Sequence, residues 1–324
     1  MRVDRHPTLV AHADWSTDAK KRWCAIAICD SDGCYQSDAP ELVGDLATYF
    51  SRLQRRAGTD AAVLCGFDFP IGLPAGYASK AGLTGFPDAL SRFGQDPWRD
   101  FFSPAPTEQA ISIRRPFYPQ RPGGTKKHHL VSGLDLQNTR ELYRSCDLHP
   151  DRGPAEAMFW LIGPKQVGRA AITGWQDLLA PAMSSDSPPS IWPFDGRLTE
   201  LLARPGVIVA ETYPAEVYRH LDLGIGGNGR SKRCRADRAA DAGALAAWAR
   251  TNRVRLTHPL HTEIVDGFGG GSDGEDRFDA VVGLFGMLDV VLGNRPSGEP
   301  DDETMQIEGW ILGQPAPARS GTQD

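Results

Sequence analysis

Acidic residues stand at the ends of apolar segments in four parts of this 324-residue sequence. Three of them end or directly follow apolar runs of the kind that form buried strands, and two open a long apolar segment near the C-terminus. Ligands of open α/β sheets bind at the carboxyl ends of strands, so we expect these carboxylates to converge at one edge of a sheet. The five residues are Asp14, Asp68, Glu211, Asp276 and Asp279.

Carboxylates gathered in this way repel one another, and a cation has to offset the repulsion. Two like charges ~4 Å apart cost about 4 kcal/mol at a moderate effective dielectric. Hard divalent cations prefer oxygen ligands, and Mg²⁺ commonly occupies sites built from carboxylates and phosphate. Two such ions roughly 4 Å apart can hold the attacking and leaving oxygens of a phosphodiester in line. The pattern predicts a Mg²⁺ or Mn²⁺ site with all five acids as ligands, in which Asp14, Asp68, Glu211 and Asp279 are catalytic.

Each acidic residue also has a plainer structural interpretation. An acid at a strand end is often a turn former or a helix N-cap, and this applies to Asp14. Asp68 stands among apolar residues, where an ion pair with an arginine could satisfy a buried carboxylate. Glu211 could open the next helix, and Asp276 and Asp279 could be first-turn acids that the helix dipole favours. The shared placement at segment ends favours a common site over separate explanations.

The first 70 residues contain the elements that would position the first two acids. Residues 8–14 and 23–29 are apolar runs joined by a short polar turn, which predicts an antiparallel hairpin. Residues 34–36 could add a weak third strand. Helical spacing of apolar residues over 40–56 predicts a helix. The continuous apolar run at 61–69 is typical of a strand buried on both faces of a sheet.

Regular patterns return in the last third of the chain. Residues 206–211 predict another buried strand, and helices are expected at 214–221 and 236–251. The segment 276–292 is apolar nearly all round, so it should be a buried helix. Residues 307–312 could form a final strand.

The intervening segment, about 71–200, is rich in Pro, Gly and Trp and shows only short helical patterns, at 134–144 and 154–162. It is too long to be one loop of a compact domain, so we expect an elaboration packed beside the sheet. Residues 1–312 are therefore predicted to form a single α/β domain with this large insertion. Residues 313–324 are expected to be a disordered tail.

A basic arm at 114–129 contains no acidic residue. Such a run can contact a phosphate backbone, and its aromatic residues Phe117 and Tyr118 could stack on bases. The arm could equally be an exposed loop of the insertion. A second basic run at 230–238 is interpreted as the solvated start of a helix. The residues expected to bind nucleic acid are Arg114, Arg115, Lys126 and Lys127.

Composition limits the other possibilities. Hydrophobic residues make up 40% of the chain and the net charge is −6, so any contact with nucleic acid must come from a local basic patch. The six cysteines show no zinc-binding spacing and are typical of a reduced, cytoplasmic protein. The longest apolar stretch is too short to cross a bilayer, and the N-terminus lacks the apolar core of a signal peptide. The sequence does not predict an oligomeric state.

Several motifs together resemble the family known as domain of unknown function 429, whose members are regarded as predicted nucleases with an RNase H-like fold. The resemblance extends over almost the whole chain and implies three antiparallel strands followed by parallel ones, flanked by helices. The D-x-x-D spacing of Asp276 and Asp279 is also similar to a motif in the final helix of Holliday-junction resolvases. Those enzymes, however, usually carry Glu where Asp68 stands. The matching stretches are His12-Ala-Asp14-Trp-Ser, Gly66-Phe-Asp68-Phe-Pro-Ile-Gly-Leu-Pro, Gly163-Pro-Lys-Gln-Val-Gly, Ala210-Glu211-Thr-Tyr-Pro-Ala, Asp276-Arg-Phe-Asp279-Ala and Glu308-Gly-Trp-Ile.

The first functional hypothesis is therefore a metal-dependent nuclease. A kinase or ATPase of the actin-like superfamily would share the core, but the glycine-rich phosphate turn expected after the first strand is missing at Asp14-Trp-Ser-Thr-Asp. A non-catalytic binding protein that keeps only the fold is the third possibility. The sequence does not distinguish DNA, RNA and nucleotide substrates.

Overall fold

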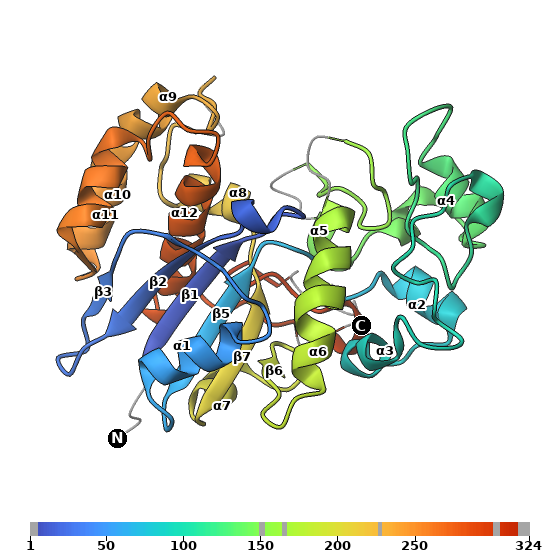
Figure 1. Cartoon of the computed structure of the whole chain (residues 1–324), viewed down its shortest axis with the longest axis horizontal. Helices are drawn as coiled ribbons and strands as arrows, with labels where there is room; N and C mark the ends of the chain where they lie inside the picture. The colour runs from blue at the N-terminus through green and yellow to red at the C-terminus, as the bar shows by residue number, and fades with distance from the viewer. Residues whose placement is uncertain (1–5, 149–152, 164–166, 226–228, 301–304, 317–324) are drawn as a thin grey trace, which may run out of the picture.

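The computed structural model of the chain describes residues 6–148, 153–163, 167–225, 229–300 and 305–316. Its centre is one twisted sheet with the strand order β6-β7-β5-β1-β2-β3-β8, and β4 pairs with β2 off this path (Figure 1). The strands are β1 Leu9–Asp14, β2 Trp23–Cys29, β3 Tyr35–Ser37, β4 Glu41–Leu42, β5 Ala62–Phe67, β6 Ser190–Ile191, β7 Gly206–Glu211 and β8 Arg255–Leu256.

The pairing directions confirm the predicted mixed sheet. Strand β1 pairs with β2 in antiparallel orientation, and β2 pairs with β3 in the same way. Strand β5 joins the other side of β1 in parallel, and β7 joins β5 in parallel. The protein therefore has an α/β fold whose first three strands are antiparallel and whose later strands are parallel, in the order expected of an RNase H-like sheet.

Helices cover both faces of the sheet (Figure 1). Helix α1 packs against β5 and β1 on one face, while α12 packs against β1, β2 and helix α8 on the other. The helices are α1 Tyr49–Ala57, α2 Ala75–Ala81, α3 Phe86–Arg92, α4 His128–Gly133, α5 Val167–Thr173, α6 Ala180–Met183, α7 Leu198–Leu202, α8 Pro214–His220, α9 Arg235–Ala240, α10 Ala242–Thr251, α11 His258–Asp266, α12 Gly274–Val291 and α13 Met305–Glu308.

Strand alternation divides the core into two clusters, one on each face. Successive side chains of a strand point to opposite faces. Leu9, Ala11 and Ala13 of β1 lie in the cluster under α1 and the insertion, whereas Val10 lies in the cluster under α12. The parity of a residue in its strand therefore decides which face its side chain reaches, and this parity governs the site described below.

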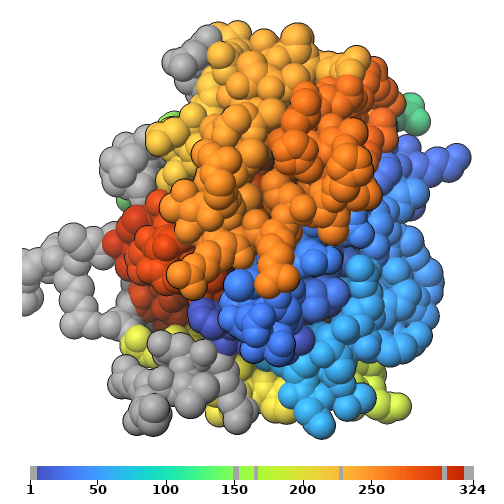
Figure 2. All heavy atoms as spheres, turned by 90° about the vertical axis from the view of Figure 1, so that its left-hand side faces the viewer, coloured from blue at the N-terminus to red at the C-terminus, as the bar shows by residue number. Residues whose placement is uncertain are grey.

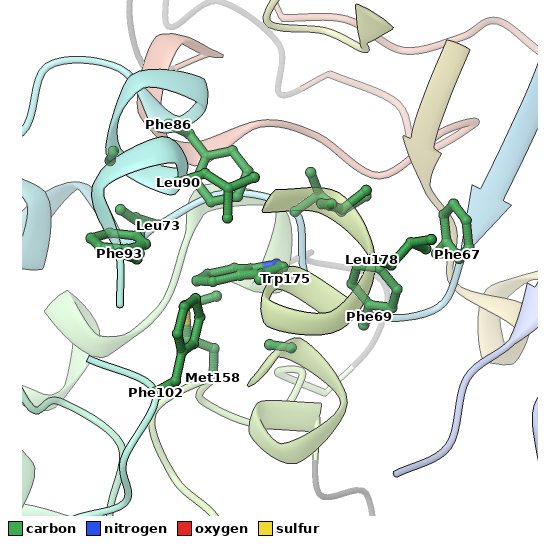
Figure 3. Close-up of a cluster of buried hydrophobic side chains, with 14 of the residues drawn as sticks. Phe67, Phe69, Leu73, Phe86, Leu90, Phe93, Phe102, Met158, Trp175 and Leu178 are labelled. Carbon is green, nitrogen blue, oxygen red and sulfur yellow. The ribbon is translucent and has the colours of Figure 1, made fainter. Parts of the chain in front are cut away.

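The insertion is built around aromatic side chains. Trp175 is fully buried and lies among Phe86, Phe93 and Phe101, as Figure 3 shows for the first two. It belongs to a π-helix, Gly174–Leu179, that continues α5 and leads into α6. These residues share one hydrophobic cluster with the sheet face that carries Phe67. This part of the chain is thus packed onto the sheet.

Some predicted elements differ from the observed ones because backbone groups find partners elsewhere. The helix expected over 40–56 begins only at Tyr49, since residues 41–42 pair with β2. Residues 154–162 form no helix, because the carbonyl of Phe159 and the N–H of Leu161 bond to Tyr118. The strand expected at 307–312 is the short helix α13 and a single bridge between Ile311 and Glu211.

The helix predicted over 236–251 is interrupted at Asp241, which separates α9 from α10. The carboxylate of Asp241 accepts N–H bonds from Gly224 and Ile225, so this residue ties the helix pair to the preceding loop. Figure 2 shows the end of the molecule where α9, α10 and α11 lie above the first strands.

The C-terminal region is ordered further than predicted. Gln314 is buried, and its side chain donates to the carbonyl of Cys146 at 3.0 Å. The expected disordered tail is therefore wrong for this residue, and 317–324 lie outside the described residues. Among the described residues, no helix has the length and hydrophobicity needed to span a membrane.

Candidate functional site

Asp14 and Asp68 lie side by side at the carboxyl ends of two parallel strands. Ala13 of β1 is in register with Phe67 of β5, so the residues that follow them reach the same level. Both face the α12 side of the sheet, opposite to Ala13 and Phe67. Asp14 is only 8% exposed. Burial and then the charge of Asp68 raise the pKa of Asp14 well above its usual range.

Helix α12 adds two more carboxylates to this cluster. Asp279 is buried, and its oxygens accept hydrogen bonds from the Tyr218 hydroxyl and the Lys232 ammonium. Asp276, one turn earlier, has a buried Oδ2 with no hydrogen-bond partner among the residues that the structure describes. Burial and then the charge of Glu275 raise the pKa of Asp276 to about 6. We use "aspartate cluster" below for Asp14, Asp68, Asp276 and Asp279.

A buried histidine sets the position of α12 over the sheet. The Nδ1 of His12 lies 3.1 Å from the carbonyl of Ala280, and its Nε2 lies 2.9 Å from the Thr212 hydroxyl. Because a carbonyl can only accept, Nδ1–H donates and Nε2 accepts from Thr212. Burial lowers the pKa of His12 to about 4, so the ring is neutral. His12 is two residues before Asp14 and touches the residue after Asp279, so this contact brings strand and helix acids together.

Lys232 is a residue of this candidate site that sequence analysis missed. It lies in the basic run 230–238, which was expected to be solvated, but its ammonium contacts Asp279 and acts electrostatically on the other three aspartates. Burial lowers the pKa of Lys232, and the charge and hydrogen bond of Asp279 more than reverse this effect. Its side chain as a whole remains 38% exposed. Clustered acids repel one another, so a cation is expected close to them. This expectation was the signal that could have pointed to Lys232 in the sequence.

Glu211 stands at the same edge of the sheet but on the opposite face, so its expected convergence with Asp14 and Asp68 is wrong. It is in register with Phe67, and both side chains point away from α12. Arg144 holds both carboxylate oxygens of Glu211 at 2.6 Å, and the N–H of Ile71 bonds to one of them. On the α12 face, Thr212 occupies the corresponding level.

Arg144 is the centre of a buried ionic network. Its guanidinium is 1% exposed and also bonds both oxygens of Asp147. Glu308 of α13 joins the network through its backbone carbonyl, and its carboxylate accepts the N–H groups of Ala75 and Ser145. These bonds connect the insertion, β7 and the C-terminal segment. The network accounts for Glu211 structurally, in the manner of the ion pair considered for buried acids.

The basic arm at 114–129 is largely committed to its own fold. Arg115 donates to the carbonyls of Ser103 and Pro104, and Lys127 pairs with Glu156 at 2.5 Å. Arg114 and Lys126 are exposed.

The aromatic residues of the arm cannot take the role that was predicted for them. Phe117 and Tyr118 are buried, so the prediction that they stack on bases is wrong. The arm leads into α4, which lies beyond α5 and away from α12 along the long axis of the molecule (Figure 1).

The aspartate cluster has the donor chemistry of a site for a hard divalent cation. All its donors are carboxylate oxygens, and one of them, Oδ2 of Asp276, is buried without a partner in the described part of the chain. Four carboxylates act on one another here, and Lys232 is the cation common to all of them. As placed, no three His, Cys, Asp or Glu side chains of the described residues form a ready-made set of metal ligands.

Comparisons of the chain with models of protein families, with curated proteins and with solved structures find no match. The resemblance to domain of unknown function 429 stays a prediction from the motifs quoted above.

Proposed function

We propose that the protein is a divalent-metal-dependent phosphodiesterase that acts on nucleic acid. The observation that carries the proposal is the convergence of Asp14, Asp68 and Asp279. They come from three elements, β1, β5 and α12, that are far apart in sequence, and a buried histidine fixes the helix that brings the third. Gathering like charges in a fold costs electrostatic free energy. A cationic ligand would offset this cost.

The four aspartates of the cluster would hold Mg²⁺ or Mn²⁺. When bound, the metal would supply Lewis-acid stabilisation of the charge on the phosphoryl oxygens. The Tyr218 hydroxyl donates a hydrogen bond to one oxygen of Asp279. This bond would fix the orientation of that carboxylate. The ammonium of Lys232, whose side chain is partly exposed, would contact a phosphate oxygen of the substrate, because only part of its donor capacity is used by Asp279.

Metal binding and cleavage can be tested together in variants of the cluster. We expect Mn²⁺ to raise the melting temperature of the wild-type protein, because a ligand that binds only the native state stabilises it. Asp14→Asn and Asp279→Asn should lose this increase and lose Mn²⁺-dependent cleavage of DNA or RNA. Asp135→Asn is the control, since Asp135 is an exposed acid that pairs with Lys80 on the surface.

The control variant should keep both properties of the wild type. A wild-type protein whose melting temperature ignores Mn²⁺ and Mg²⁺ would count against the metal site. ATP hydrolysis in the absence of any cleavage of nucleic acid would instead favour the actin-like hypothesis.

A further inference from the structure

We infer that the insertion is a working part of this site, because Thr173 positions the Asp68 carboxylate through Trp15. The inference rests on the proposed function for the meaning of the site. The link begins at the backbone of Trp15, whose N–H donates to Oδ1 of Asp68 at 2.7 Å. The indole Nε1–H of the same residue donates to the hydroxyl of Thr173, at the end of α5, at 3.0 Å. One residue therefore connects the insertion to a carboxylate of the cluster.

The indole of Trp15 is held in its orientation by contacts with aromatic rings, a guanidinium and a hydroxyl. It is 6% exposed and makes edge contacts with Phe67 and Phe69, the residues on either side of Asp68. The guanidinium of Arg22 lies over its ring, 4.3 Å from the ring centroid. Since the ring cannot turn freely, the backbone N–H of Trp15 stays aimed at Asp68.

Arg22 connects the same loop to the insertion a second time. Its Nε donates to the carbonyl of Ser16 at 2.6 Å, which closes the loop that follows Asp14. Its NH2 group lies 3.7 Å from a carboxylate oxygen of Asp177 in the π-helix. Arg22 is 5% exposed although Asp177 is largely exposed, so the arginine is anchored by the loop and the ring as much as by the acid.

The π-helix also supports the chain on the other side of Asp68. The indole of Trp175 donates to the carbonyl of Pro70 at 2.7 Å. A Cβ at Gly174 would lie 2.6 Å from the ring of Phe69, so the absence of a side chain there allows the helix to approach the Asp68 loop closely. π-Helical turns are uncommon and often occur next to functional sites. The insertion thus contacts Trp15, whose N–H bonds to Asp68, and also Phe69 and Pro70, which follow Asp68.

These contacts make Thr173 a positioning residue for the proposed metal site. Thr173 does not touch the cluster itself. Its hydroxyl accepts from Trp15 while it donates to a carbonyl of α5, so its orientation is fixed from both sides. Groups that orient a metal ligand commonly change metal affinity by about 10- to 100-fold when they are removed. We expect an effect near the lower end, because the aromatic contacts of Trp15 remain.

The test compares variants that keep or remove one hydrogen bond. Thr173→Val keeps the shape of the side chain and removes the acceptor, and it should weaken Mn²⁺ binding about tenfold with little change in melting temperature. Thr173→Ser restores a hydroxyl and should bind Mn²⁺ like the wild type. Trp15→Phe removes the donor and should resemble Thr173→Val.

Trp98→Phe is the matched control, because Trp98 is equally buried and its Nε1–H has no partner among the described residues. Hydrogen exchange of the Trp15 amide, which the bond to Asp68 protects, gives a second measurement that needs no metal. This amide should exchange faster in Thr173→Val than in the wild type and in Trp98→Phe.

A lower melting temperature of Thr173→Val, with unchanged Mn²⁺ affinity and unchanged exchange at Trp15, would overturn the inference and leave Thr173 a purely structural role. If the wild type binds no Mn²⁺, the proposed function fails, and amide exchange alone then decides whether Thr173 positions Asp68. Faster exchange would support the inference, and unchanged exchange would reject it.

Discussion

The charges of the aspartate cluster are only partly balanced in the metal-free protein. Burial and the charges of three other carboxylates raise the pKa of Asp14, while the ammonium of Lys232 lowers it. Burial raises the pKa of Asp68 to about 7, even though the N–H of Trp15 favours its ionised form. Protonation therefore offsets part of the repulsion near neutral pH, and metal binding must compete with protons for these oxygens.

This balance predicts the direction of the pH dependence of stability without metal. An aspartate has a pKa of about 3.9 in the unfolded chain, so between pH about 4 and about 7 the folded protein binds more protons at Asp68 than the unfolded chain does. The free energy of unfolding should accordingly decrease as the pH rises through this range. In Asp68→Asn this contribution disappears, and the variant should gain stability relative to the wild type as the pH rises.

Urea denaturation in EDTA at several pH values measures the difference between the two proteins. His12 contributes with the opposite sign, because burial lowers its pKa to about 4 and its contribution is lost as the pH falls below about 6.5. It is present in both proteins, so it does not affect their difference. Parallel stability curves for wild type and variant would contradict the raised pKa of Asp68.

Three of the four aspartates in the cluster could be located from the sequence because each stands at or within a recognisable element. Asp14 and Asp68 end apolar runs that become β1 and β5, and Asp279 lies in a helix whose apolar residues are unmistakable. Glu211 ends a strand equally clearly, but the count of residues along β7 places it on the other face. Lys232 follows no regular element, and its contact with Asp279 depends on tertiary structure that spacing alone does not show.

At the scale of elements, the position of α12 depends on residues without bulky side chains. A Cβ at Gly283 would lie 2.1 Å from the His12 ring, and one at Gly286 would lie 2.5 Å from Val217 of α8. Gly283 therefore allows the close approach of α12 to the sheet, while Gly286 accommodates a neighbouring helix.

Gly283→Ala should consequently push α12 away from β1. The added methyl group meets a ring held by two hydrogen bonds, so we expect a loss of about 1–3 kcal/mol of stability, the usual cost of overpacking. Gly243→Ala in α10 is the control, because nothing lies within 4 Å of its Cβ. That variant should be neutral or up to about 1 kcal/mol more stable, since alanine favours helix more than glycine does.

Urea midpoints of the two variants give the comparison directly. Because His12 also links α12 to the strand that carries Asp14, Gly283→Ala should in addition weaken Mn²⁺ binding. Equal stability of the two variants would show that the His12 contact does not determine how closely α12 approaches the sheet.

The elements that sequence patterns described well are those buried against the sheet. The β1–β2 hairpin, β5, β7 and α12 have long apolar patterns that only one kind of element satisfies. The insertion was not predictable in detail, because its short segments are fixed by contacts with distant residues. Residues 154–162 show this, since backbone groups of Phe159 and Leu161 bond to Tyr118 and the N–H of Ala155 bonds to Asp147.

At the scale of the whole molecule, two separate groups of cations could bind a phosphate backbone. One is the basic arm, of which Arg114 and Lys126 are exposed. The other we call the cationic rim, and it consists of Lys20, Lys21 and Arg233, which are exposed residues from two segments beside the aspartate cluster. The charge of Lys21 acts on Asp276, and Nε of Arg233 lies 3.7 Å from Glu275, next to that aspartate. The rim is thus the group nearer to the proposed site of cleavage.

We predict that the rim contributes more to nucleic-acid binding than the arm does. Each lost phosphate contact lowers the slope of log affinity against log salt by about 0.7 to 0.9. Replacing Lys20, Lys21 and Arg233 with Ala should therefore weaken binding strongly at low salt and flatten the salt dependence. Replacing Arg114 and Lys126 with Ala should change both quantities less, because the arm leads into α4, which lies beyond α5 and away from α12 along the long axis of the molecule (Figure 1). Fluorescence anisotropy of a labelled oligonucleotide at several salt concentrations measures both slopes. A flatter slope in the arm variant, with a wild-type slope in the rim variant, would contradict this prediction. It would indicate that nucleic acid binds the basic arm, as the sequence suggests, and not the rim.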